Sequence, residues 1–466
     1  MALEEDLDRC SRGDLKQMIR LLMKQVETLE VRVKEQDKRI AELESRLNEP
    51  PKNSGNSSVP PSKGFKKNKN QDENKAKRTG LRQGSVGRKG VNRPLAENPD
   101  EVVRVMAKTC EHCHANLGEE NQTLREAYDK IDIPEIKPRV TRVEIYGGAC
   151  PCCAKKTTPI CVPDGLQKGS PFSMNITALA VYLRFVHAIS YERLARLFRD
   201  LFGLGISEGA LDAVLRRAKP CFDRDVTAIL ARLRKSRVIY SDETSIRMNG
   251  KNWWNWVFQN DEIVLHVIRR SRGSQVVEDV LGDHRPALWV SDLYGAQQGY
   301  AEEWQVCLAH QLRDCRYACE AGDAVFAPRM KRLVLRAFVI AKRQDKLTAA
   351  TRLALKERLE RDLKEILALP VEHKDAKRLQ KRYRKHGASL FTFLKHPELA
   401  PDNNSSERAL RPTATYRKVT GGFRSIWGSE LYAAARSVIG TAAKQGTHAF
   451  QAIQSSLAQS RAYAAG

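Results

Sequence analysis

The sequence lacks a long hydrophobic run. No apolar stretch approaches the roughly 18 residues of a membrane-spanning helix, and the N-terminal MALEEDLDRC is not typical of a secretory signal peptide. We therefore expect a cytoplasmic protein without a membrane partner. Acidic residues are also scarce, with 56 Asp and Glu against 80 Lys and Arg and a formal net charge of +24. Such an excess of positive charge attracts a polyanion, and nucleic acid is the first candidate.

A disulfide framework is not expected from the 11 cysteines of a cytosolic chain. Two C-x-x-C pairs, CEHC at 110–113 and CPCC at 150–153, supply the four thiolates that a structural Zn²⁺ takes. They predict a zinc ribbon over residues 99–165, with the strand-like RVTRVEIYGGAC leading into the second pair. The expected ligands are Cys110, Cys113, Cys150 and Cys153. Cys152, His112 or His114 could replace one of them, and buried unpaired cysteines are the alternative.

Apolar residues fall on two interleaved heptad rows between residues 15 and 47. One row is mostly β-branched and the other mostly Leu, which favours a parallel two-stranded coiled coil. Residues 1–49 are therefore predicted to dimerise through 15–47, with a single amphipathic helix as the alternative. Residues 50–98 have almost nothing to bury and predict a flexible basic linker. This linker would contact phosphates or act as a spacer.

Residues 170–222 have the periodicity of three helices. The third opens at a Ser cap with Glu208 just inside it, after a turn that contains Gly203 and Gly205. Such an arrangement is typical of a helix-turn-helix, whose last helix enters a DNA major groove. A helical packing domain explains the same pattern equally well. Residues 429–466 are likewise expected to be helical.

Short β-branched and aromatic runs follow these helices. The runs at 236–244, 253–260 and 262–270 predict a three-stranded meander joined by the turns NGK and ND. A helix over SQVVEDVLG and a buried fourth strand in ALWVSDLYGAQQG should come next. Asp242 and Asp292 each follow an apolar run near a strand end, where a carboxylate without a partner is costly to bury.

Two carboxylates on adjacent strands converge on one edge of a sheet, and a third from a nearby helix would complete an oxygen cage suited to Mg²⁺. Glu407, in PDNNSSERALRP, can be that third group. The local sequence also fits a variant capping box, with Asn404 as the N-cap and Glu407 three residues later. Five basic residues follow that suit a phosphodiester substrate, with a solvated charged face as the alternative: Arg408, Arg411, Arg417, Lys418 and Arg424.

Four segments resemble motifs of insertion-sequence-66-type transposases: YSDETSIRMNGKNWWNWVF, VSDLYGAQ, CLAHQLRD and DNNSSERALRPTATYRKVTGGFRS. The heptads, the basic linker and the cysteine pairs match that family's N-terminal order as well. The resemblance implies a multidomain α+β protein with a ribonuclease-H-like α/β catalytic core over 235–428, interrupted by a helical insertion at about 324–385. It also implies an Asp-Asp-Glu triad at Asp242, Asp292 and Glu407. His310, in CLAHQLRD, is expected after the next strand and near the site, either as a functional residue or as an ordinary hydrogen-bonded histidine.

By the same resemblance, the protein would bind the ends of an insertion sequence. With Mg²⁺ or Mn²⁺ at the triad it would cleave DNA and join the freed 3′-hydroxyl to target DNA. The expected partners are the terminal inverted repeats, target DNA and accessory proteins of the same element, and the DNA-bound protein would be nucleoid-associated in a bacterial cell. Two other functions stay open: a catalytically silent DNA-binding regulator, and a metal-dependent nuclease without strand transfer.

Overall fold

The computed structural model describes residues 11–47, 49–50, 52–53, 56, 93–159, 161–163 and 165–459. These residues divide into two compact units, which are described separately: one consists of residues 93–142 and 196–206, and the other of the rest. Most of the predicted basic linker lies outside the described residues. Within the described ranges, no helix is both long enough and apolar enough to cross a membrane.

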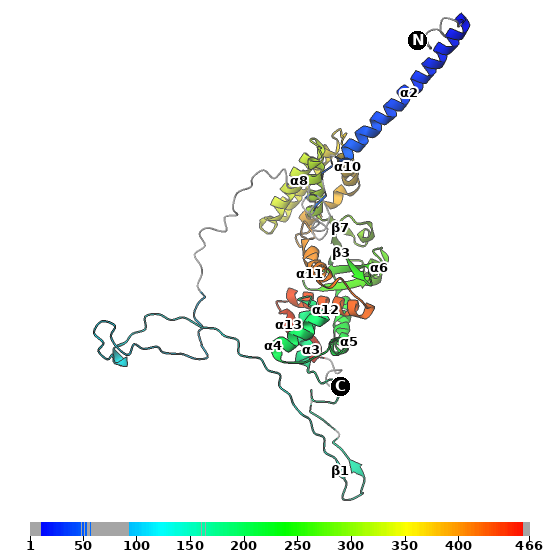
Figure 1. Cartoon of the computed structure of the whole chain (residues 1–466). Helices are drawn as coiled ribbons and strands as arrows, with labels where there is room; N and C mark the ends of the chain where they lie inside the picture. Colours follow the sequence, from blue (N-terminus) through cyan, green and yellow to red (C-terminus); the bar gives the residue numbers. More distant parts are fainter. Residues whose placement is uncertain are drawn as a thin grey trace, which may run out of the picture. The chain divides into compact units, whose positions relative to one another are not determined.

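Helix α2 spans Arg12–Leu47 (Figure 1) and carries both predicted heptad rows. The apolar side chains of these rows that the structure describes are about half exposed: Ile19, Leu22, Val26, Leu29, Val33 and Ile40. The predicted helix is confirmed. The pairing of this helix with a second copy of the chain stays a prediction.

Three helices follow the cysteine-containing segment: α3 (Met174–Phe185), α4 (Tyr191–Phe202) and α5 (Glu208–Leu233). The Ser207 side chain caps α5 by accepting a hydrogen bond from Ala210 N at 3.2 Å, as predicted. Contrary to the predicted end of the helical segment near residue 222, α5 continues through Pro220 to Leu233. A proline removes one helical hydrogen bond. Buried side chains on both sides of it keep α5 packed in the core and offset that loss.

A five-stranded mixed sheet has the strand order β5-β4-β3-β6-β7. Strands β3 (Val238–Met248), β4 (Lys251–Gln259) and β5 (Val264–Arg269) form the predicted antiparallel meander. The turn between β3 and β4 consists of Asn249 and Gly250, both with positive φ (46° and 75°), as a tight hairpin requires.

Strands β6 (Leu288–Ser291) and β7 (Glu303–Val306) extend the sheet in parallel on the other side of β3. Strand β6 is the predicted fourth strand. Helix α6 (Gln275–Leu281) precedes it, as expected from SQVVEDVLG. Because β6 runs parallel to β3 and pairs with its first residues, the C-terminal residues of β6 lie near the start of β3 rather than at its far end.

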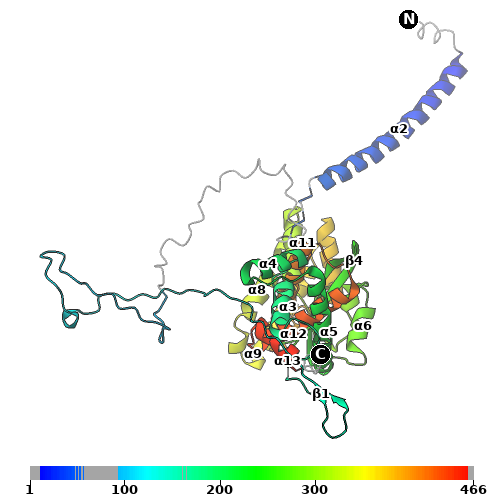
Figure 2. The same cartoon turned by 60° about the horizontal axis from the view of Figure 1, so that its bottom comes forward.

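Helices cover both faces of the sheet (Figure 1). Ile239 and Trp289 pack on one face with α3, α5, α6, α12 (Ile426–Lys444) and α13 (Ala449–Ala458), and Figure 2 shows α3, α5, α12 and α13 side by side. Tyr240 and Val290 pack on the opposite face with α7 (Leu308–Glu320), α8 (Phe326–Ala341), α9 (Ala349–Leu367) and α10 (Lys374–His386). The last three helices occupy the predicted helical insertion.

Helix α11 (Asn404–Thr420) lies along β3 and β4 and is held at both ends. At its start, Asn403 Nδ2 donates to Ser241 O at 2.7 Å. After its end, Gly422 (φ 108°) brings the backbone against β3, and Phe423 N donates to Arg247 O at 2.8 Å. These contacts fix the first turn of α11, which carries Glu407, beside the first half of β3.

Candidate active site

Asp242 and Asp292 lie opposite each other on neighbouring parallel strands. The register pairs Tyr240 with Val290, so Asp242, two residues further along, lies beside Asp292 on the same face of the sheet. Each carboxylate is fixed by a backbone N–H: Asp242 Oδ1 accepts from Glu243 N at 2.9 Å, and Asp292 Oδ1 accepts from Tyr294 N at 2.8 Å. The structure therefore brings these two predicted residues together.

Glu407 approaches the same place from the first turn of α11. The helix start is tied to the sheet by Asn403, bonded to the carbonyl before Asp242, and by Ser406 Oγ, which accepts from Gln259 Nε2 at 3.0 Å. The Glu407 carboxylate lies close enough to Asp242 for its negative charge to raise the pKa of Asp242. The start of α11, which carries Glu407, thus lies beside the part of β3 that carries Asp242.

The alternative interpretation of Glu407 as part of a capping box is wrong. The N-cap of α11 is Asn403 rather than Asn404, and it makes no capping hydrogen bond with its side chain. Its amide is used on Ser241 instead. The Glu407 carboxylate does not bond the helix backbone but accepts from Arg313 Nη2 at 2.7 Å.

Burial and crowded negative charge raise the pKa of Asp242 well above its usual value. The neighbouring charges are those of Glu243, Asp292 and Glu407. Carboxylate oxygens are the donors that Mg²⁺ prefers, and a divalent cation would relieve this repulsion, so the donor chemistry fits the metal. Among the described residues, however, no group of three or more His, Cys, Asp or Glu side chains is arranged to hold a metal ion. Glu407 is engaged with Arg313 instead.

Glu243 is a buried carboxylate that the sequence analysis did not single out. Its side chain is 1% exposed, and burial together with Asp292 raises its pKa to about 7. Arg272 donates to Glu243 Oε1 through Nε (2.9 Å) and Nη2 (2.6 Å), and Gln297 Nε2 donates to Oε2 at 2.5 Å. The Arg272 guanidinium is in turn held over the rings of Trp254 and Tyr294. This network joins the part of β3 next to Asp242 to the loop after Asp292.

Arg313 and His310 both come from α7, in the segment CLAHQLRD. His310 Nε2 is 3.7 Å from Glu407 Oε1, and burial together with Arg313 lowers the pKa of His310. An open cavity of about 300 Å³ lies in front of Arg313 and Glu407. Its lining residues are Ala309, Leu312, Arg313, Arg316, Phe338, Asp402, Asn404 and Glu407.

The model of the Transposase IS66 family matches residues 169–431, more than half of the 466-residue chain. The chain belongs to this family. A search of curated proteins found no match. Membership of the IS66 transposase family implies DNA as a partner and a divalent metal as a cofactor, and the matched span contains Asp242, Asp292 and Glu407.

The predicted basic cluster of this IS66 family member is divided between a helix face and a loop. Arg408, Arg411 and Lys418 are exposed on α11 at spacings of three and seven residues, so they form one stripe that begins next to Glu407. Arg417 is half-buried and donates to Ser245 Oγ at 2.7 Å, which ties it to β3. Of the five predicted basic residues, Arg408, Arg411 and Lys418 thus share one exposed face of α11 next to Glu407.

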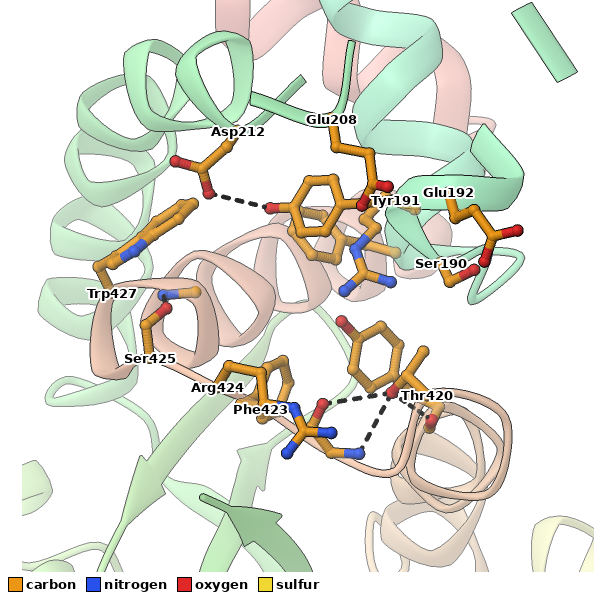
Figure 3. A pocket seen from close by; sticks show the side chains of 15 residues that line it. Ser190, Tyr191, Glu192, Glu208, Asp212, Thr420, Phe423, Arg424, Ser425 and Trp427 are labelled. Carbon is orange, nitrogen blue, oxygen red and sulfur yellow. Dashed lines mark hydrogen bonds between the residues drawn. The ribbon is translucent and has the colours of Figure 1, made fainter. Parts of the chain in front are cut away.

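Arg424 lies apart from the stripe, in the loop between α11 and α12, where it lines a cavity of about 330 Å³ (Figure 3). The buried Arg184 guanidinium lies over the rings of Tyr191 and Tyr416 in this cavity. Three acidic residues, Glu192, Glu208 and Asp212, contribute to the same lining. The cavity is therefore not uniformly basic.

Two tight turns of the same form contain the predicted zinc ligands of the IS66 family member. In the first, Cys110 N donates to Ala115 O at 2.9 Å and His114 N donates to Cys110 O at 3.0 Å, with φ 57° at His114. Hydrogen bonding to Cys113 and His112 lowers the pKa of Cys110, which favours the thiolate that binds metal.

The second turn repeats this pattern. Cys150 N donates to Lys155 O at 2.9 Å and Ala154 N donates to Cys150 O at 2.8 Å, with φ 52° at Ala154. Hydrogen bonding to Cys153 and Cys152 lowers the pKa of Cys150. The two-residue strands β1 (Gly148–Ala149) and β2 (Lys156–Thr157) flank the turn, so the longer strand predicted before it is wrong.

Proposed function

We propose that the protein is an Asp-Asp-Glu transposase that cleaves the ends of an insertion sequence and joins them to target DNA. Asp242, Asp292 and Glu407 are its proposed metal ligands. The observation that carries the proposal is that Asp242 and Asp292 lie side by side on β3 and after β6, with the start of α11 bonded next to Asp242, in a member of the IS66 transposase family. The strand order β5-β4-β3-β6-β7, three antiparallel strands and then two parallel ones, supports a ribonuclease-H-like core.

When bound, Mg²⁺ or Mn²⁺ would activate water or a 3′-hydroxyl and neutralise charge on the reacting phosphate. The side chains of Asp242 and Asp292 provide oxygens from a rigid sheet, where backbone N–H groups already orient them. The ion pair between the buried Glu243 and the partly exposed Arg272 joins β3 to the segment after β5. The basic stripe on α11 would hold the DNA backbone beside the carboxylates.

A plasmid that carries the element's own ends tests this function. In Mg²⁺, Asp242→Asn and Asp292→Asn should each reduce cleavage and joining by about 10³-fold, because several kcal/mol of metal stabilisation are lost. Asp283→Asn, an exposed aspartate outside the site, is the matched control and should stay active. Cleavage without joining by the wild type would favour the nuclease, and DNA binding without cleavage would favour the silent regulator.

We also propose that Cys110, Cys113, Cys150 and Cys153 bind one structural Zn²⁺. Two turns of equal form, each with a Cys whose pKa is lowered, support this assignment. Elemental analysis should find one zinc per chain, and Cys110→Ser with Cys113→Ser should lose it. Cys161→Ser, a change of an exposed cysteine outside both pairs, should keep the metal. Zinc retained by the double variant would refute the ligand set.

A further inference from the structure

Glu407 and Arg313 form an ion pair that the proposed catalysis does not use. Arg313 Nη2 lies 2.7 Å from Glu407 Oε1, with 16% of the Arg313 side chain and 26% of the Glu407 side chain exposed. A charge-assisted bond in such a partly buried place is stronger than an ion pair on the surface. The bond to Arg313 occupies the Glu407 carboxylate, which the proposed metal site needs as a ligand.

Arg313 is the counter-charge of Glu407 among the described residues. The other basic group in ion-pair range is His310, at 3.7 Å. Arg313, at 2.7 Å, is the nearer cation. A divalent ion at the three carboxylates would bring positive charge towards the guanidinium, and like charges at short range repel each other. Arg313 and a metal ion therefore compete for Glu407.

The cavity in front of Arg313 suits a phosphodiester. It is open, has a volume of about 300 Å³ and is lined by both Arg313 and Arg316, one turn apart on α7. Arg313 Nη1 makes no hydrogen bond or ion pair to a residue that the structure describes, so the guanidinium keeps donors for a further anion. Its planar fork matches two phosphate oxygens.

Helix α7 is anchored without Arg313. Arg382 of α10 donates to Asp314 Oδ2 at 2.5 Å, with 21% and 13% of the two side chains exposed. Arg382 also donates to Gln311 Oε1 at 3.3 Å. Because these bonds hold the helix on the side of α10, Arg313 can change its partner while α7 stays in place.

We propose that Arg313 is a phosphate-binding residue that exchanges Glu407 for a phosphate of substrate DNA. This inference rests on the proposed function, since it takes Glu407 as a metal ligand. A phosphate that binds the guanidinium releases Glu407, which then completes the oxygen set with Asp242 and Asp292. DNA and the divalent metal consequently bind cooperatively, and each raises the affinity for the other by the same factor.

Mn²⁺ binding to the full-length chain without DNA, measured by electron paramagnetic resonance, tests the part of the proposal that concerns Glu407. Arg313→Gln should bind Mn²⁺ about tenfold more tightly than the wild type. Arg313→Lys, which keeps a cation beside Glu407, should remain near the wild type. Arg316→Gln removes an equal charge from the same helix and should change the affinity by less than about twofold, because Arg316 makes no bond to Glu407. The double variant Arg313→Gln with Glu407→Gln should not show this gain in Mn²⁺ affinity.

The salt dependence of binding to a mixed-sequence DNA duplex tests the part that concerns phosphate. Arg313→Gln should reduce the slope of log affinity against log salt by about 1, the effect of one lost phosphate contact. An unchanged slope, or Mn²⁺ binding by Arg313→Gln no tighter than that of the wild type, would overturn the proposal. If Glu407→Gln alone cleaves DNA normally, the proposed function itself fails. If Glu407→Gln is inactive but Arg313→Gln changes neither Mn²⁺ binding nor the salt slope, only the proposed exchange of partners by Arg313 is refuted.

Discussion

The carboxyl of Asp242 is destabilised by its own surroundings. Burial and the charges of Glu243, Asp292 and Glu407 all raise its pKa, and Asp242 Oδ1 accepts one hydrogen bond, from Glu243 N. A side chain selected for stability alone would not be placed there, because buried like charges oppose folding. This cost is typical of functional sites, where a ligand restores the balance.

Removal of the charge at Asp242 should therefore stabilise the metal-free protein. We expect Asp242→Asn to gain about 1 kcal/mol or more at pH 8, which corresponds to about 2–4 °C in Tm for a domain of this size. Mg²⁺ or Mn²⁺ should raise the Tm of the wild type and leave that of Asp242→Asn unchanged, because only the wild type binds the metal.

Differential scanning calorimetry with and without metal checks this prediction. Asp283→Asn, which removes an exposed charge, should behave like the wild type in both conditions. A lower Tm for metal-free Asp242→Asn would mean that the carboxylate has a structural role, as a hydrogen-bond acceptor that the amide cannot replace.

The sequence reveals a site residue when the pattern around it is local, and it does not reveal a contact with a partner far away in the chain. Asp242 and Asp292 stand out because each interrupts an apolar strand, and this contrast is local. The partners of Glu243 and Glu407, Arg272 and Arg313, are 29 and 94 residues away, and nothing in the local sequence marks them. The true N-cap, Asn403, could not be distinguished from Asn404, because its bond to Ser241 spans 162 residues.

At the scale of elements, α11 is positioned by contacts at its two ends. Asn403 bonds the backbone of β3 before Asp242, and Phe423 bonds it at Arg247. Gly421 (φ 73°) ends the helix, and Gly422 (φ 108°) allows the close approach to Arg247. The placement of Glu407 therefore depends on a glycine pair 14 residues away in sequence.

Gly422→Ala should destabilise this connection. A methyl group there would clash with the carbonyl oxygen of Arg247, and the positive φ adds strain. We expect a loss of about 2–4 kcal/mol, at the upper end of single substitutions. Gly421→Ala has a similar φ but open space around the added methyl group, and should lose only about 1 kcal/mol. Urea denaturation of the two variants measures the difference, and equal losses would contradict the steric account.

The sequence predicted helices and strands best where a regular spacing of apolar residues or a single turn type determines them. The meander β3-β4-β5 follows from short apolar runs and the Asn249–Gly250 turn. The end of α5 was missed because Pro220 is a helix breaker in isolation, whereas Phe222, Ile229 and Leu233 continue a buried face beyond it. The C-terminal end of α5 is therefore set by tertiary packing, which a local sequence pattern does not contain.

At the scale of the whole molecule, most of the positive charge lies outside the candidate site. The net charge of +24 is far larger than the few cations near the three carboxylates. Helix α2 presents an apolar surface, because its described heptad side chains are about half exposed in the single chain. Exposed apolar rows of this length favour association with a second copy.

We predict a homodimer through residues 15–47. Val26→Asp with Val33→Asp places charges in the apolar row and should give monomers in sedimentation velocity, because a charge at a core heptad position is costly to bury. Val31→Asp makes the same chemical change outside both rows, at a position that is 58% exposed, and should leave the dimer intact. An unchanged mass for the double variant would refute this seam.

The central claim is that Glu407 is a metal ligand in a transposase that cleaves and joins DNA, and cleavage and joining by Glu407→Gln in Mg²⁺ test it most directly. The amide keeps the size of the side chain and its capacity to accept a bond from Arg313, but it loses the charge that holds a divalent ion. We predict a loss of about 10³-fold in both steps, with DNA affinity maintained. Glu357→Gln, a change of an exposed residue on α9, should stay fully active. Full strand transfer by Glu407→Gln would contradict the account.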